Sequence, residues 1–465
     1  MKNFGWFDIF RLGLVQAALG SVVVLTTSTL NRVMVVELAL PALLPGVLVA
    51  WHYLVQVARP RMGYGSDLGA RRTPWIIGGM AVLALGGVTA ALATVWMGSD
   101  RPAGIALALL GFSLIGLGVS ASGTSLLVLL AKRVAEKQRA AAATIVWMMM
   151  IAGFAITAGV AGHLLDPYST ARLLVITTGV SVLALLITCA ALFRLEGAPD
   201  AAAPPMPSPQ ATQSRRPAFR QALNQVWKEP VARQFTIFVF VSMLAYSAQD
   251  LILEPFAGAV FGFTPGGSTR LSGLQHGGVL AGMLLVAVAG TLGGYFPGTP
   301  VLRRFASLRG WTVAGCLASA LALAGLVAAG LTGPGWPIKA NVFALGVANG
   351  VFSIGAISSM MRLASEGRHA REGVRMGLWG AAQAVAFGLG GLLGTAASDL
   401  ARMLIAAPGD AYAAVFGFEA LMFVASAALA WHIGSPGNPI RNAVNGSPTY
   451  RAKAGDALVA AMEHR

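Results

Sequence analysis

Long apolar runs separated by short polar stretches make up most of this chain. A helix that crosses a bilayer needs about 20 mostly apolar residues, and twelve runs of roughly that length can be read along the sequence. The pattern therefore predicts an all-α polytopic membrane protein with twelve transmembrane helices. Their predicted limits are 12–31, 41–58, 73–97, 103–131, 141–164, 170–193, 233–257, 274–296, 309–331, 337–361, 373–399 and 411–433.

One long polar stretch divides these runs into two sets of six. Residues 196–214 are rich in Ala, Pro, Ser and Gln, and such a composition cannot bury enough apolar surface to fold alone. The stretch is therefore predicted to be a linker. The predicted organisation is an N-terminal six-helix half at 1–195, a cytoplasmic linker at 196–232, a C-terminal six-helix half at 233–434 and a cytoplasmic tail at 435–465.

Composition supports a membrane protein and excludes most soluble enzymes. Only 11% of the residues are charged, 56% are hydrophobic and the mean hydropathy is +0.70, whereas soluble domains carry about 25% charged residues. The net charge of +15 could suggest nucleic acid, but 27 of the 33 basic residues fall on one predicted side of the membrane. Because basic loops stay in the cytoplasm, this bias predicts cytoplasmic termini and no nucleic-acid partner.

The two halves resemble each other, as in transporters built from repeats. Span 1 ends in LNRVMVVEL and span 7 in AQDLILEPF. This alignment sets Asn31 and Arg32 against Gln249 and Asp250, with Glu37 near Glu254. Charges within the membrane are costly unless they are paired, so we predict an ion pair between Arg32 and Asp250. It would serve either as a gate or polar anchor in a central cavity, or as a structural bridge between the halves.

A glycine-rich motif with two arginines lies between the second and third spans. The stretch GYGSDLGARR resembles the G-x-x-x-D-x-G-x-R-R signature of the major facilitator superfamily, on the expected cytoplasmic side. The resemblance implies the major facilitator fold of two six-helix pseudo-repeats, with the motif as gating machinery. The matching positions are Gly63, Asp67, Gly69, Arg71 and Arg72.

Other stretches are similar to the PucC/LhaA bacteriochlorophyll delivery family. They are LNRVMVVEL, the Arg59-Pro60 pair before GYGSD, QDLILEPFAG, and GLWGAAQA at 377–384. The resemblance implies a light-harvesting complex assembly factor that binds bacteriochlorophyll or a precursor and delivers it to antenna polypeptides. Implied partners are those polypeptides, membrane lipids and pigment-synthesis enzymes. The implied location is the bacterial inner membrane or the photosynthetic intracytoplasmic membrane.

A chlorin needs an axial ligand for its magnesium and a flat apolar surface. His52 and His276 are the histidines within or near apolar runs. His52 has the alternative role of a helix-end residue bonded to backbone or lipid, and Asn or Gln oxygens, waters or backbone carbonyls could ligate magnesium equally well. No protein-ligated metal is expected, since the two cysteines, Cys189 and Cys316, give no metal quartet. The candidate pigment or cavity residues are Asn31, Arg32, Glu37, His52, Gln249, Asp250, Glu254, Trp379 and Gln383.

Two further functions stay open from the residues. The sequence contains no G-x-x-x-x-G-K loop, zinc-type His/Glu pair or nucleophile elbow, so an enzyme is not expected. A secondary transporter of an amphipathic solute could couple to protons through Asp250, Glu254 or Glu419. A passive assembly scaffold that binds no pigment is the other alternative.

Overall fold

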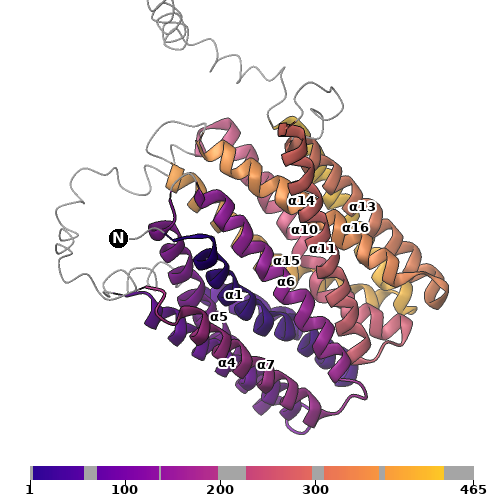
Figure 1. The fold of residues 1–465 in the computed structure, drawn as a ribbon. Helices are drawn as coiled ribbons and strands as arrows, with labels where there is room; N and C mark the ends of the chain where they lie inside the picture. Colours follow the sequence, from indigo (N-terminus) through magenta and orange to yellow (C-terminus); the bar gives the residue numbers. More distant parts are fainter. Residues whose placement is uncertain are drawn as a thin grey trace, which may run out of the picture.

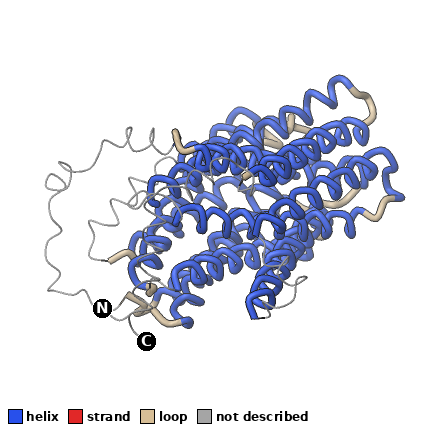
Figure 2. Tube along the Cα trace, turned by 90° about the horizontal axis from the view of Figure 1, so that it is seen from above, coloured by secondary structure: helices blue, strands red, loops and turns tan. Residues whose placement is uncertain are grey.

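The computed structural model describes residues 4–56, 71–135, 138–196, 227–295, 308–365 and 372–433. Within these ranges the secondary structure is helical, with no strand (Figure 2). Eleven of these helices are long and apolar enough to cross a membrane, and a further apolar helix, Leu43–Val55, has 13 residues. The prediction of twelve helices is confirmed.

The first six helices and the last six gather in two groups (Figure 1). The first group consists of α1 (Trp6–Val24) with its extensions η1 (Leu25–Leu30) and η2 (Val33–Glu37), α2 (Leu43–Val55), α4 (Thr73–Trp96), α5 (Arg101–Arg133), α6 (Arg139–Leu164) and α7 (Thr170–Leu192). The second consists of α10 (Pro230–Phe261), α11 (Pro265–Tyr295), α13 (Leu308–Thr332) with the short turn η5 (Gly333–Gly335), α14 (Ile338–Ser365), α15 (Glu372–Leu404) and α16 (Pro408–His432).

Each group builds its own core. In the first, buried side chains such as Leu12, Leu83 and Phe112 pack together. In the second, the core contains several aromatic rings, and the ring of Phe256 lies 5.1 Å from that of Phe416. A third, smaller cluster joins the groups through α6, α11 and α14. The boundaries predicted for the linker and the tail fall largely outside the described residues and stay predictions.

The helix ends follow local chemistry. Asp100 accepts a hydrogen bond from the Ala103 amide at the start of α5 (3.1 Å), and Ser169 accepts one from the Arg172 amide at the start of α7 (3.1 Å). Such side chains satisfy amides that have no partner within the helix. Gly262 ends α10 in the left-handed conformation, with φ of 66°, which glycine adopts without steric cost.

Two helices extend beyond their predicted limits at the same end of the bundle. The first helix continues as π-helix through η1 and η2 as far as Glu37, and α11 begins nine residues before position 274. The extra residues of α11 are PGGSTRLSG, which are too polar to be recognised as part of an apolar run. They can be polar because they face η1 of the other half. We call this end of the bundle the distal end. It holds η2, the α6–α7 loop and the α10–α11 turn, opposite the N-terminus.

Helices α6 and α11 approach each other closely along the seam between the halves. A Cβ atom added at Gly273 would lie 2.8 Å from the Gly159 amide nitrogen, and one added at Gly162 would lie 2.7 Å from the Gly266 carbonyl oxygen. Small residues allow helix backbones to meet in this way. The seam is therefore in backbone contact on this side.

Candidate functional site

Hydroxyl groups join the two halves at the distal end. The Oγ atoms of Ser28 and Ser272 lie 2.8 Å apart, and the Oγ1 atoms of Thr29 and Thr269 lie 3.0 Å apart. All four side chains are buried. Ser28 and Thr29 belong to η1, a π-helical segment, and such segments are frequent at functional sites. One polar layer therefore connects η1 to α11.

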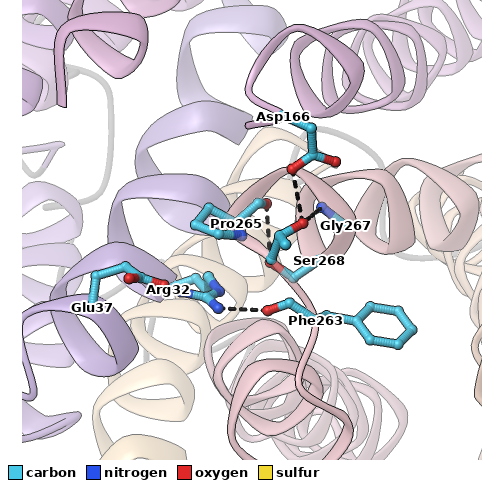
Figure 3. Close-up of polar contacts among 8 residues, drawn as sticks. Arg32, Glu37, Asp166, Phe263, Pro265, Gly267 and Ser268 are labelled. Atoms are coloured by element: carbon cyan, nitrogen blue, oxygen red, sulfur yellow. Dashed lines mark hydrogen bonds and ion pairs between the residues drawn. The ribbon is translucent and has the colours of Figure 1, made fainter. Parts of the chain in front are cut away.

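Arg32 lies at the same end of the bundle, between Glu37 and Phe263 (Figure 3). The residue is 2% exposed, and its Nη1 atom lies 2.5 Å from Oε1 of Glu37. Its Nη2 atom donates to the carbonyl oxygen of Phe263 at 2.6 Å. A Cβ atom at Gly258 would lie 3.0 Å from Nη2, so glycine there leaves room for the guanidinium. Arg32 thus ties the end of η2 to the α10–α11 turn.

The predicted ion pair between Arg32 and Asp250 is wrong. Arg32 pairs instead with Glu37 on its own segment, and the Asp250 carboxyl group lies near the side chain of Gln275 on α11. The physical reason is the π-helix, because each wider turn rotates the following side chains relative to an α-helix. The contact with α10 is made by Asn31, whose Nδ2 atom donates to the Leu251 carbonyl at 2.6 Å.

Three carboxyl groups lie within the C-terminal half near this layer. Glu254 and Glu419 are each 1% exposed, and none of their side-chain oxygens makes a hydrogen bond within the described residues. The hydroxyls of Ser28 and Ser272 and the guanidinium of Arg32 lie near Glu254, while Glu419 of α16 lies near Asp250. A buried carboxylate without a partner is costly, so these positions are candidates for function.

The pKa of Tyr168, in the loop between α6 and α7, depends on the charges of Arg32 and Glu37. Burial raises the pKa of its hydroxyl, the negative charge of Glu37 raises that pKa further, and the positive charge of Arg32 lowers it. The ring is half-buried against the core of the N-terminal half. The distal end therefore holds a titratable reporter of this ion pair outside the spanning helices.

The remaining predicted pigment residues do not join this layer. His52 lies on α2, with its Nε2 atom 2.8 Å from Nε2 of Gln56. Trp379 is buried near the start of α10, where its Nε1 atom donates to the Ala232 carbonyl at 3.4 Å and its ring meets Phe235. Trp379 therefore packs within the C-terminal half. The last two predicted pigment residues are glutamines. Gln249 is fully buried on α10. Gln383 is half-buried, and its Nε2 atom lies 4.0 Å from the Met243 sulfur.

The gating motif is only partly within the described ranges. Gly63, Asp67 and Gly69 lie outside them, whereas Arg71 and Arg72 stand at the start of α4. The carboxylate of Glu196 accepts hydrogen bonds from the amides of Arg72 and Thr73, each at 2.8 Å, and from the Thr73 hydroxyl at 2.8 Å. Sequence reasoning placed Glu196 in the linker and missed this cap. A lone acidic residue 124 positions from Arg72 carries no local signal of such a contact.

The comparisons with known proteins decide the family. A sequence model of the family described as PUCC protein matches residues 29–437. The chain belongs to the PucC family. A relative from Rhodobacter capsulatus named bacteriochlorophyll synthase 44.5 kDa chain is 52% identical over 428 residues, covering 92% of this chain and 95% of the relative. Protein PucC of Rhodobacter capsulatus is 29% identical, covering 91% of each chain.

Solved structures support the fold of this PucC-family chain. A peptide transporter POT structure matches with a TM-score of 0.68 at 14% identity, covering 93% of this chain and 97% of that one. The structure of a D-xylose–proton symporter matches with a TM-score of 0.66 at 14% identity, covering 92% and 97%. At such identities the likeness concerns the fold alone. The chain is thus an integral membrane protein of the PucC family with a transporter-like fold.

Proposed function

We propose that this protein binds bacteriochlorophyll or a precursor within the membrane and delivers it to antenna polypeptides as an assembly factor. The observation that carries the proposal is the relative named bacteriochlorophyll synthase 44.5 kDa chain, which is 52% identical across 92% of this chain. Relatives named Protein PucC, at 29% identity, add the family context. Antenna polypeptides and pigment-synthesis enzymes are the proposed partners.

His276 of α11 fits the role of magnesium ligand. Its Nδ1 atom lies 2.8 Å from the Ser272 carbonyl oxygen, and because a carbonyl can only accept, Nδ1 carries the proton. Nε2 is then the nitrogen with the lone pair, and it makes no hydrogen bond within the described residues. A backbone bond that fixes the tautomer in this way is typical of metal-ligating histidines. Phe154 of α6 meets the ring edge-on at 5.1 Å and holds its orientation.

We further propose that the chain does not itself catalyse pigment synthesis. The word synthase belongs to the name of the relative. In this sequence, nucleotide-binding loops of the G-x-x-x-x-G-K type and nucleophile elbows do not occur. The transporter-like fold suits a carrier that encloses an apolar molecule. The proposed role is therefore to hold and hand over pigment that other enzymes make.

A proton-coupled transporter is the second candidate. The observation that favours it is the pair of buried carboxyl groups, Glu254 and Glu419, whose oxygens lack hydrogen-bond partners within the described helices. Ionisable side chains inside a membrane protein commonly mark ion or proton pathways. The substrate in that case would be an amphipathic solute.

Purification from a bacteriochlorophyll-producing phototroph in mild detergent tests the proposal. We expect a stoichiometric pigment band in the absorption spectrum and antenna polypeptides in the same fraction. The H276A variant is expected to lose most of the band, whereas the matched variant H163A, altered at an exposed histidine at the end of α6, keeps it. A colourless protein with antenna polypeptides would support a scaffold instead. A colourless, solitary protein would support the transporter.

A further inference from the structure

The N-terminus of α2 is capped by a carboxylate from the other half. Asp399 of α15 accepts hydrogen bonds from the Ala42 amide at 3.0 Å through Oδ1 and from the Leu43 amide at 2.7 Å through Oδ2. No side chain of the local segment caps this helix. The first amides of a helix need such acceptors, and a negative charge is stabilised at the positive end of the helix dipole. Asp399 therefore joins α15 to α2.

A second carboxylate reaches across the seam in the opposite direction (Figure 3). Asp166, two residues after α6, accepts a hydrogen bond from the Thr264 hydroxyl at 2.8 Å and pairs with Arg270 of α11 at 2.7 Å. The same Thr264 oxygen accepts from the Gly267 amide at 3.0 Å, so Thr264 caps α11. Asp166 thus acts on the N-terminus of α11 through its capping residue.

The two contacts are related by the internal repeat. Helices α2 and α11 are each the second helix of their half, and α6 and α15 are each the fifth. In both cases a carboxylate at the distal end of a fifth helix holds the start of the second helix of the other half. Neither contact lies within one half alone. A rotation of one half against the other that opened the distal end would have to break both contacts.

We infer that Asp166 and Asp399 are a matched pair of latches that hold the distal end closed, and that the protein has a second arrangement in which both latches are released. In the closed arrangement the Ser28–Ser272 contact lies behind them, with both residues buried. Release of the latches exposes that contact. The inference goes beyond the proposed function, because it requires no pigment and holds for a carrier or a transporter alike.

Labelling of a single cysteine behind the latches tests the inference. Both native cysteines are first removed in the full chain (C189A and C316A) and Ser28→Cys is introduced. The protein is reconstituted in liposomes and treated with a membrane-impermeant maleimide added from the distal side. We expect slow labelling of the introduced thiol with intact latches and a rate about tenfold higher with D166N/D399N, since a minor arrangement populated at about 1% would rise to about 10%.

Asp100→Asn is the matched control, because Asp100 also caps a helix but acts within its own half. Its labelling rate is expected to equal that of the background protein. Each single variant, D166N or D399N, is expected to give an intermediate rate, which keeps the test valid if the double variant does not accumulate. An unchanged rate in D166N and in D399N overturns the inference, and so does an equal increase in D100N.

Discussion

Arg32 and Glu37 lie five residues apart in one helical segment, and their side chains meet at 2.5 Å between Nη1 and Oε1. The arginine side chain is 3% exposed and the glutamate side chain 35%. The pair therefore links a buried cation to an anion at the rim, while the buried carboxyl group of Glu254 receives no hydrogen bond from that guanidinium. This arrangement determines which substitutions at the distal end are costly.

Replacement of Arg32 by alanine is expected to lower the free energy of unfolding by about 1–3 kcal/mol, because the Phe263 carbonyl loses its donor and Glu254 loses a neighbouring cation. Thermal unfolding in detergent measures the change. Glu37→Gln, at the exposed end of the same pair, is the control, with an expected loss of about 0–1 kcal/mol. Equal losses in the two variants would contradict this assignment.

Tyr168 provides a spectroscopic test of the same ion pair. Because burial and Glu37 raise its pKa, its hydroxyl should ionise later than ordinary tyrosines in an absorbance titration, and Y168F should remove that late step. Glu37→Gln should lower the pKa and Arg32→Ala should raise it. A pKa raised by folding makes stability fall as the pH rises above about 10. If the pKa of Tyr168 is the same in E37Q as in the unaltered protein, the Arg32–Glu37 pair is contradicted.

The two buried glutamates should respond differently to neutralisation. Glu419 lies near the like charge of Asp250, whereas Glu254 lies near Arg32. Glu419→Gln is therefore expected to raise the free energy of unfolding by about 1 kcal/mol, and Glu254→Gln by less. Denaturation of the two variants side by side in one detergent gives the comparison. A larger gain in the free energy of unfolding for Glu254→Gln than for Glu419→Gln would show that neighbouring groups stabilise the charge of Glu254 less.

Cross-linking across the seam should arrest delivery if the distal end must open. The Oγ atoms of Ser28 and Ser272 are 2.8 Å apart, so cysteines at both positions should form a disulfide under mild oxidation. Antenna assembly should stop in the oxidised protein and return after reduction. The control is S21C/T157C, because Ser21 and Thr157 are in contact at 2.7 Å within one half. Full assembly with the seam cross-linked would refute the need for opening.

Glu196 should contribute to stability although it stands at the edge of the predicted linker. Its carboxylate accepts hydrogen bonds from three donor groups at the start of α4, so Glu196→Ala is expected to cost about 1 kcal/mol. Glu196→Gln keeps an acceptor oxygen and should cost less. Thermal unfolding of the two variants measures both effects, and no loss in E196A would show that water replaces the cap.

The helices could be predicted because each requires a long apolar run, and such a run can be read directly along the sequence. The prediction fell short at α11, where PGGSTRLSG is helical but polar, since it packs against η1 rather than lipid. It also failed for the partner of Arg32, because sequence alignment of the repeats fixes the helix on which a residue lies but not its rotation. The π-helical turns at Leu25–Leu30 change that rotation.

The latch carboxylates were equally hidden in the sequence. Asp166 and Asp399 act on amides and a hydroxyl from distant segments, and a hydrogen bond to backbone leaves no pattern of matching side chains. Their roles depend on which helix ends meet, which is a property of the packed bundle. The basic residues of the predicted motif, in contrast, could be named from the sequence because a local pattern of glycine and arginine defines them, and their gating role stays a prediction.

The glycine contacts between α6 and α11 have a mechanical consequence. Where Gly159 meets Gly273, the atoms nearest to an added Cβ are all backbone, whereas the side chains of Arg270 and Asp166 stand beside Gly162 and Gly266. At the Gly159–Gly273 contact, a rotation of one helix against the other therefore forces no side chain into another rotamer and costs little side-chain entropy. This contact can serve as a pivot about which the halves turn once the Asp166 and Asp399 contacts are released.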